Sequence, residues 1–153
     1  MTLYGNQGDD LILDSFSRVV KRAGGGLDCK ALSRDEADFC RVVWLEASVD
    51  NGGFASFFYN SYGDFTPETL EALSRIGASE AEHLLRLAMA VFGPGGPSRD
   101  QDARNEFIER MGDEGDTALS KLDKAFYSQE ARLHECLLAF LKSAGLADPV
   151  AGD

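Results

Sequence analysis

The sequence predicts an all-α fold, arranged as a single compact domain of about seven or eight short helices. Apolar residues recur at steps of three and four along almost the whole chain, which is the spacing of one face of an α-helix. No alternation of apolar and polar residues continues for more than a few positions, so no β-strand is indicated. A length of 153 residues suits one domain with a sizeable core. We expect residues 1–147 to form the domain and residues 148–153 to be a frayed tail.

Two helices are expected in the first third of the chain. An apolar pattern from Leu11 to Val20 follows two aspartates, which suit a helix N-terminus, and the three glycines at 24–26 end it. Ser33 and Glu36 then have the spacing of a capping box, in which each side chain accepts a hydrogen bond from the other residue's backbone N–H. The wide apolar face that follows predicts a central helix over residues 34–50.

Glycine, proline and capping residues divide the middle of the chain into three further helices. They are expected over residues 54–62, 66–76 and 79–92. Glycines 52 and 53 separate the first of them from the central helix, and Thr66, followed by proline, is expected to cap the second. Ser79 and Glu82 predict another capping box at the start of the third.

The last third of the sequence begins with a Gly/Pro loop at residues 93–97, which we interpret as a surface loop or hinge within the one domain. Three helices are expected after it, from Ser98 to Met111, around Leu119 to Phe126, and from about Ser128 to Gly145.

The charge of the chain is strongly negative. It has 26 acidic and 15 basic residues, a net charge of −11 and an isoelectric point near 4.5. Such a chain repels nucleic acid and anionic lipid and attracts basic proteins, so we expect no direct nucleic-acid binding. The first ten residues are polar, no apolar run is long enough for a membrane span, and the three cysteines form no C-x-x-C pair. We therefore expect a reduced, cytoplasmic protein without a membrane segment.

No recognisable catalytic motif, P-loop or dinucleotide-binding glycine fingerprint is present. Glu80 and His83 have the E-x-x-H spacing of di-iron carboxylate bundles, but such a site needs a second copy on a facing helix. Glu130 and His134 are four residues apart rather than three. The sequence therefore predicts no enzyme, no cofactor and no metal site.

The central helix carries a carboxylate on its apolar stripe, where Phe39, Val43, Glu46 and Asp50 share a face. A buried carboxylate needs hydrogen-bond donors or a shifted pKa. We expect a structural motif of six residues in which one of the first three caps the helix that follows: Glu46, Asp50, Asn51, Gly52, Gly53 and Phe54. The alternative is a general base in a cleft lined by Phe57, Phe58 and Tyr59.

Acidic residues gather between Asp100 and Asp116, where seven acids and two bases give a net charge of −5. Five of them, which we call the acidic stripe, step by four and three residues: Asp102, Glu106, Glu109, Asp113 and Asp116. If one helix continues past Gly112, they form a line of negative charge opposite the apolar face, with roughly 4.5–6 Å between steps. The acidic stripe is the candidate partner-binding surface, and a solvated helix face is the alternative.

The segment from Glu46 to Asp64 is more specific than helix formation requires, because it carries E-x-x-V-x-N-G-G-F followed by an aromatic pair and Asn-Ser-x-Gly-Asp. It resembles a family of small acidic bacterial proteins that includes a DNA mimic and is otherwise filed as a domain of unknown function. The segment from Leu73 to Ala78 fits the family's Leu-x-x-Ile-Gly-Ala pattern, and the resemblance extends from about Asp35 to Phe140. Asp50 departs from the asparagine expected in many relatives.

The resemblance implies an all-α domain that can dimerise and that presents carboxylates where DNA presents phosphates. Such a protein would occupy the DNA-binding surface of a basic regulator or nucleoid protein. The family carries no single binding residue over to this chain, so the acidic stripe is our own candidate. Two alternatives remain open: an immunity or antitoxin-like inhibitor of a basic nuclease, and an enzyme that uses Glu46 or Asp50.

Overall fold

The computed structural model describes residues 7–24 and 26–147, and every regular element in these ranges is helical. The elements are α1 (Gln7–Ala23), α2 (Arg34–Tyr59), the 3-10 helix η1 (Ser61–Phe65), α3 (Thr66–Ile76), α4 (Ser79–Ala90), α5 (Gln101–Arg110) and α6 (Gly112–Ser143). The all-α prediction is confirmed. The expected frayed tail at residues 148–153 lies outside the described residues.

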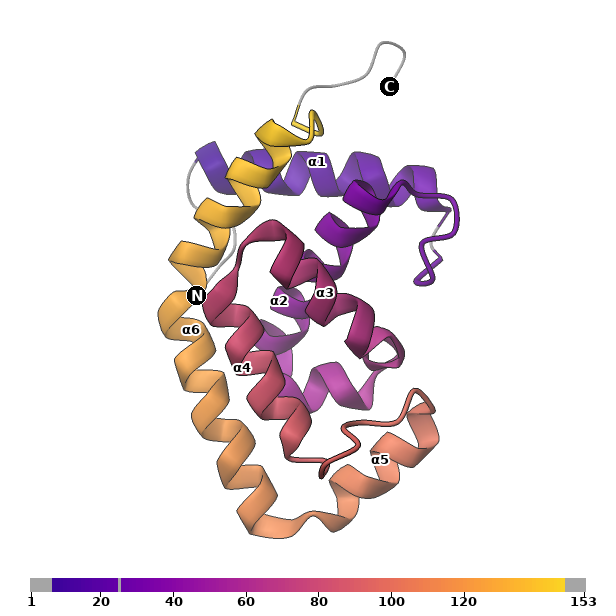
Figure 1. Cartoon of the computed structure of the whole chain (residues 1–153), viewed down its shortest axis with the longest axis vertical. Helices are drawn as coiled ribbons and strands as arrows, with labels where there is room; N and C mark the ends of the chain where they lie inside the picture. Colours follow the sequence, from indigo (N-terminus) through magenta and orange to yellow (C-terminus); the bar gives the residue numbers. More distant parts are fainter. Residues whose placement is uncertain (1–6, 25, 148–153) are drawn as a thin grey trace.

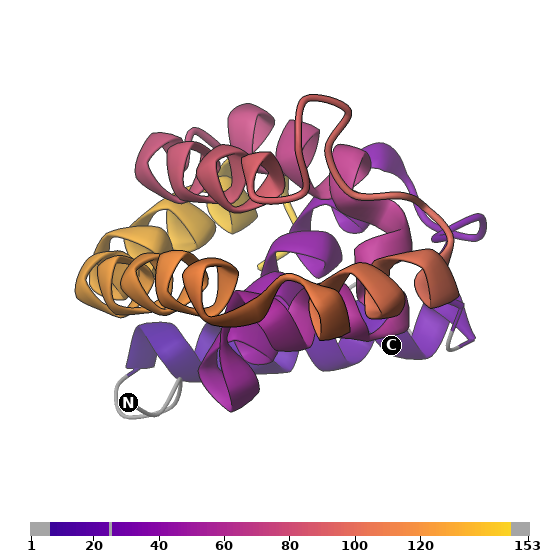
Figure 2. The same ribbon diagram turned by 90° about the horizontal axis from the view of Figure 1, so that it is seen from below.

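Helix α2 is the central element, as its wide apolar face predicts. α3 packs on one side of it and α1 on the other, while α6 runs along the length of the molecule beside α2 and α4 (Figure 1; Figure 2). α5 lies at the end of the molecule away from α1 (Figure 1). One continuous core joins these helices, and its largest fully buried apolar side chains include Phe39, Leu45, Phe54, Phe58, Leu85, Leu119 and Phe126.

The N-terminus of α2 has the capping box that the sequence predicts. The Ser33 hydroxyl accepts from the Glu36 N–H at 3.2 Å, and the Glu36 carboxylate accepts from the Ser33 N–H at 3.0 Å. The expected break at glycines 52 and 53 is a kink inside α2, because the chain resumes its helical path directly afterwards. Gly53 has φ 77° and ψ −178°, a conformation that only glycine adopts readily.

The last two predicted helices form one continuous helix, α6, so the expected start near Ser128 is wrong. The Ser128 hydroxyl donates to the Lys124 carbonyl at 3.0 Å, one turn back in the same helix, instead of capping a new one. Gly115 does not interrupt α6 either, and it leaves room for the Met111 side chain that packs against it. The sequence predicts eight helices. Because two of them merge in α2 and two more merge in α6, the described residues contain six α-helices, together with the 3-10 helix η1.

Two predicted helix caps are wrong. Thr66 is already the first helical residue of α3, and its hydroxyl donates to the Gly63 carbonyl at 2.7 Å. Ala78 is the N-cap of α4 and has no capping side chain, so Ser79 and Glu82 form no capping box. The tight turn from α3 explains this, because Gly77 is left-handed at φ 83° and the Ala78 N–H already donates to Leu73 O.

Residues 91–100, which include the Gly/Pro loop, connect α4 to α5 without regular structure. All three cysteines are free, with Cys29 and Cys40 buried and Cys136 partly exposed. Among the described helices, none combines the length and the apolar character that crossing a bilayer requires.

Candidate functional site

The acidic stripe is split between two helices. Helix α5 carries Asp102, Glu106 and Glu109, and its C-cap is Met111, while α6 begins at Gly112 with a left-handed φ of 71°. Figure 1 shows α6 leaving this corner in a direction different from that of α5. The straight line of charge that one continuous helix would give is therefore not formed. The carboxylates lie instead on both sides of a corner at one end of the molecule.

All five side chains of the acidic stripe are exposed, but two of them have partners. Glu106 pairs with Arg110 at 2.7 Å, and Glu109 accepts a hydrogen bond from the Tyr59 hydroxyl at 3.2 Å. Asp102, Asp113 and Asp116 have no ion pair with any described residue. These three carboxylates are the part of the stripe with charge available to a partner.

Arg104 fixes the orientation of α5, and it does not neutralise the surface. Its side chain is fully buried, and its five N–H groups donate to five acceptors on η1, on the loop before α5 and at the end of α2: Phe58 O, Ser98 O, Arg99 O, Asn60 O and Asp64 Oδ1, at 2.6–3.0 Å. Its charge is compensated inside the molecule by Asp64 at 2.6 Å. The sequence shows Arg104 only as one of two bases among the seven acids between Asp100 and Asp116. Its position opposite the acids was the signal that it faces inward.

The N–H group of Phe54, just after the kink in α2, is capped from another helix. Asp123 of α6 accepts from it at 2.8 Å, so the prediction that Glu46, Asp50 or Asn51 provides this cap is wrong. A side chain on Gly53 would collide with the same Asp123 carboxylate, which explains the second glycine of the motif. Phe54 is fully buried and packs edge to face on Phe126, with 5.6 Å between ring centroids. The six-residue motif therefore positions α2 against α6.

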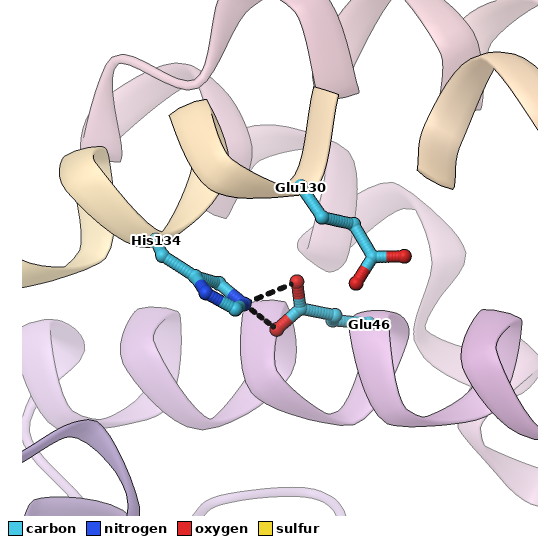
Figure 3. Close-up of side chains that lie close together, drawn as sticks. All are labelled: Glu46, Glu130 and His134. Carbon is cyan, nitrogen blue, oxygen red and sulfur yellow. Dashed lines mark hydrogen bonds and ion pairs between the residues drawn. The ribbon is translucent and has the colours of Figure 1, made fainter. Parts of the chain in front are cut away.

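Glu46 faces α6 rather than the kink. Its side chain is 0% exposed, and both carboxylate oxygens lie 2.8–2.9 Å from Nε2 of His134 (Figure 3). Two aromatic residues proposed to line a cleft with it, Phe57 and Phe58, are in the core, whereas Tyr59 is exposed. The arrangement expected for a general base in an aromatic cleft is therefore not formed.

His134 joins Glu46 to a larger buried cluster. Its Nδ1 lies 3.0 Å from Asp9 Oδ1 on α1, and Glu130 lies one helical turn before it on α6. The ligand atoms of Glu46, Glu130 and His134 all lie within 4.8 Å of one another. Glu130 and His134 lack the E-x-x-H spacing, so the sequence does not predict a metal site at them. A separation of four residues nevertheless places two side chains on one helix face, and that signal could have found the cluster.

The protonation of this cluster is set by burial and by mutual contact. Burial, and to a smaller extent the neighbouring carboxyls of Asp50 and Glu46, together raise the pKa of Glu130 to about 9. Burial also raises the pKa of Glu46, while its hydrogen bond with His134 opposes that shift. The same hydrogen bond raises the pKa of His134. The pKa values of all three groups are therefore raised, which favours their protonated forms.

Glu80 and His83, the other candidate pair, do not form a site. Both are exposed on α4, and Glu80 lies 4.0 Å from Arg132.

Comparison with known proteins gives one family match. The family model described as DMP19-like protein matches residues 30–144. No curated protein and no solved structure matches the chain. The matched region contains the kink of α2, the acidic stripe and three members of the buried cluster, whereas Asp9 lies before it.

Proposed function

Because the chain belongs to the DMP19-like family, we propose that it is a non-enzymatic DNA mimic that occupies the DNA-binding surface of a basic regulator or nucleoid protein. The proposal is carried by one observation, the exposed carboxylates on both sides of the α5–α6 corner, where a fully buried arginine fixes α5. A net charge of −11 adds a long-range attraction for basic partners.

The corner suits a nucleic-acid mimic better than a straight helix would, because the phosphates that a protein contacts across a groove do not lie on one straight line. Asp102 belongs to one helix, while Asp113 and Asp116 belong to the next. The free carboxylates would take the place of phosphates, which supply a large part of the affinity of DNA-binding proteins. Attraction of this kind weakens as salt screens it.

The test compares two triple variants with the same change in net charge. The first is Asp102→Asn with Asp113→Asn and Asp116→Asn, and the control neutralises three exposed acids elsewhere, Asp14→Asn, Asp35→Asn and Glu135→Gln. The immobilised wild-type chain captures proteins from a bacterial lysate at rising salt, and duplex DNA is used to elute them. The affinity of an eluted DNA-binding protein is then measured for each variant.

We expect the stripe variant to bind that protein about 3- to 150-fold more weakly, since exposed ion pairs contribute about 0.2–1 kcal/mol each. The control variant should bind like the wild type. Equal losses in both variants would mean that only net charge matters. Captured partners that are acidic, or that duplex DNA does not displace, would refute mimicry.

A further inference from the structure

We propose that Glu46, Glu130 and His134 bind a divalent transition-metal ion, of which Zn²⁺ and Mn²⁺ are examples, in the core between α2 and α6 (Figure 3). One imidazole nitrogen and two carboxylates form a donor set that such ions accept. Their ligand atoms lie within 4.8 Å of one another, so a point exists that is within about 2.8 Å of all three. Metal bonds of about 2.0–2.2 Å would require each side chain to move by less than about 1 Å.

Glu130 is the residue that points to a cation. Its side chain is 0% exposed, and neither carboxylate oxygen receives a hydrogen bond from any described residue. Its near neighbours are the carboxyl groups of Asp50 and Glu46, which offer acceptors rather than donors when ionised. Figure 3 shows it reaching from α6 toward the Glu46 carboxylate on α2. A buried carboxylate in such surroundings is costly unless a cation or a proton joins the group.

His134 is already oriented for metal binding. Its Nδ1 lies 3.0 Å from Asp9 Oδ1, and its Nε2 faces the two glutamates. With Nδ1–H donated to Asp9, loss of the Nε2 proton frees the lone pair that a metal needs, and a carboxylate behind the histidine is the usual support of a metal-bound imidazole. When the ion binds, it takes the place of the proton that Nε2 shares with Glu46, and that proton leaves to solvent.

The charge of the cluster favours a divalent ion. The carboxyl groups of Asp9, Glu46 and Glu130 lie around one imidazole, and that of Asp50 is a neighbour of Glu130 and Glu46. A divalent cation would compensate two of these charges and bond to both glutamates. The competing explanation is that Glu130 simply keeps a proton, and the experiment is designed to separate the two.

The experiment titrates the full chain with Zn²⁺ by calorimetry after metal has been stripped with a chelator. Glu130→Gln keeps the shape of the side chain but removes a charged ligand, and Glu135→Gln on the same helix is the matched control, because Glu135 is exposed. We expect the wild type and E135Q to bind one Zn²⁺ with equal affinity. E130Q should bind more than about a hundredfold more weakly, since loss of a residue that merely supports a ligand already costs about 10–100-fold.

Asp9→Asn tests the positioning residue and should weaken Zn²⁺ binding by about 10–100-fold without changing the number of ions bound. Zn²⁺ at a hundredfold excess over Kd should raise the Tm of the wild type by roughly 5–10 °C and leave that of E130Q unchanged. If E130Q does not fold, X-ray absorption spectroscopy of the Zn²⁺-loaded wild type identifies the atoms that bind the ion. Nitrogen and oxygen ligands support the site, and sulfur ligands overturn it. Absence of binding, or equal affinity in E130Q, also overturns it and leaves the proton as the occupant.

Discussion

Replacing Arg104 with lysine should lower the free energy of unfolding by about 2–4 kcal/mol and loosen α5 from the rest of the molecule. All five N–H groups of the guanidinium are used, on Phe58 O, Asn60 O, Ser98 O, Arg99 O and Asp64 Oδ1. A lysine ammonium keeps the positive charge but has only three donors, so at least two acceptors lose their partner.

The magnitude follows from those two lost bonds. A hydrogen bond to a charged group contributes about 1.5–3 kcal/mol, so two would give about 3–6 kcal/mol if no water replaced them. Only the bond to Phe58 O is fully buried, and water can reach some of the other acceptors, which reduces the expected loss to the range above. Urea unfolding followed by circular dichroism measures this loss, and amide hydrogen exchange of residues 101–110 reports the release of α5.

Arg99→Lys is the control. Arg99 also donates to a carboxylate, Glu68, at 2.8–2.9 Å, but it lies on the surface, where such pairs contribute at most about 1 kcal/mol. R104K leaves the net charge unchanged, so a weaker interaction with a basic partner would show that the orientation of α5 matters. A loss below about 0.5 kcal/mol for R104K, or an equal loss for R99K, would refute this account of Arg104.

Three further predictions concern the kink of α2 and the cysteines. Gly53→Ala should lower the free energy of unfolding by about 1–3 kcal/mol because of its backbone conformation, and by more because the new side chain collides with Asp123. Gly77→Ala, which has open space around it, is the control and should cost about 1–2 kcal/mol. Equal losses for the two variants in urea unfolding would contradict the collision. Burial raises the pKa of Asp123 above 3.8, and the hydrogen bond from the Phe54 N–H opposes this shift. The folded state therefore binds the Asp123 proton more tightly than the unfolded state does, and the stability that this proton contributes is lost as pH rises through the folded-state pKa. Asp123→Asn should therefore gain stability relative to the wild type as pH rises above 3.8, and a difference that is flat or falls with pH in thermal unfolding would argue against it. Of the three cysteines only Cys136 is partly exposed, so a thiol reagent should label it first in the folded protein, as peptide mapping would show.

The elements that depend on neighbours in sequence were predictable. The capping box at Ser33 and Glu36 involves residues three apart, and the stop at Gly77 depends on one residue's freedom at positive φ. Both depend on local sequence, but local spacing alone does not suffice, since Ser79 and Glu82 have the same spacing and form no capping box after the tight turn from α3. Gly115 lies inside α6 despite the weak helix propensity of glycine, and the Met111 side chain packs against it.

The parts of the site that involve distant residues could not be predicted. The cap of Phe54 comes from Asp123, 69 residues away, and the partner of Glu46 comes from His134, 88 residues away. The sequence does show that Glu46 is on an apolar stripe and needs a partner, but only the packing of α6 against α2 selects which one. The acidic stripe failed as a straight line for a local reason, the left-handed Gly112, which the sequence allowed but did not require.

Among the described helices, α6 is the last to leave the ribosome, and this order matters for folding during synthesis. Asp123, Glu130 and His134 all belong to it, so a nascent chain that ends before residue 112 has a kinked α2 without its cap and a Glu46 without its imidazole. The apolar side of α2 and α4 that α6 covers is exposed to water until then. The core therefore closes only after α6 has been synthesised, and a ribosome that stalls before or within α6 releases a chain that is a substrate for chaperones and proteases.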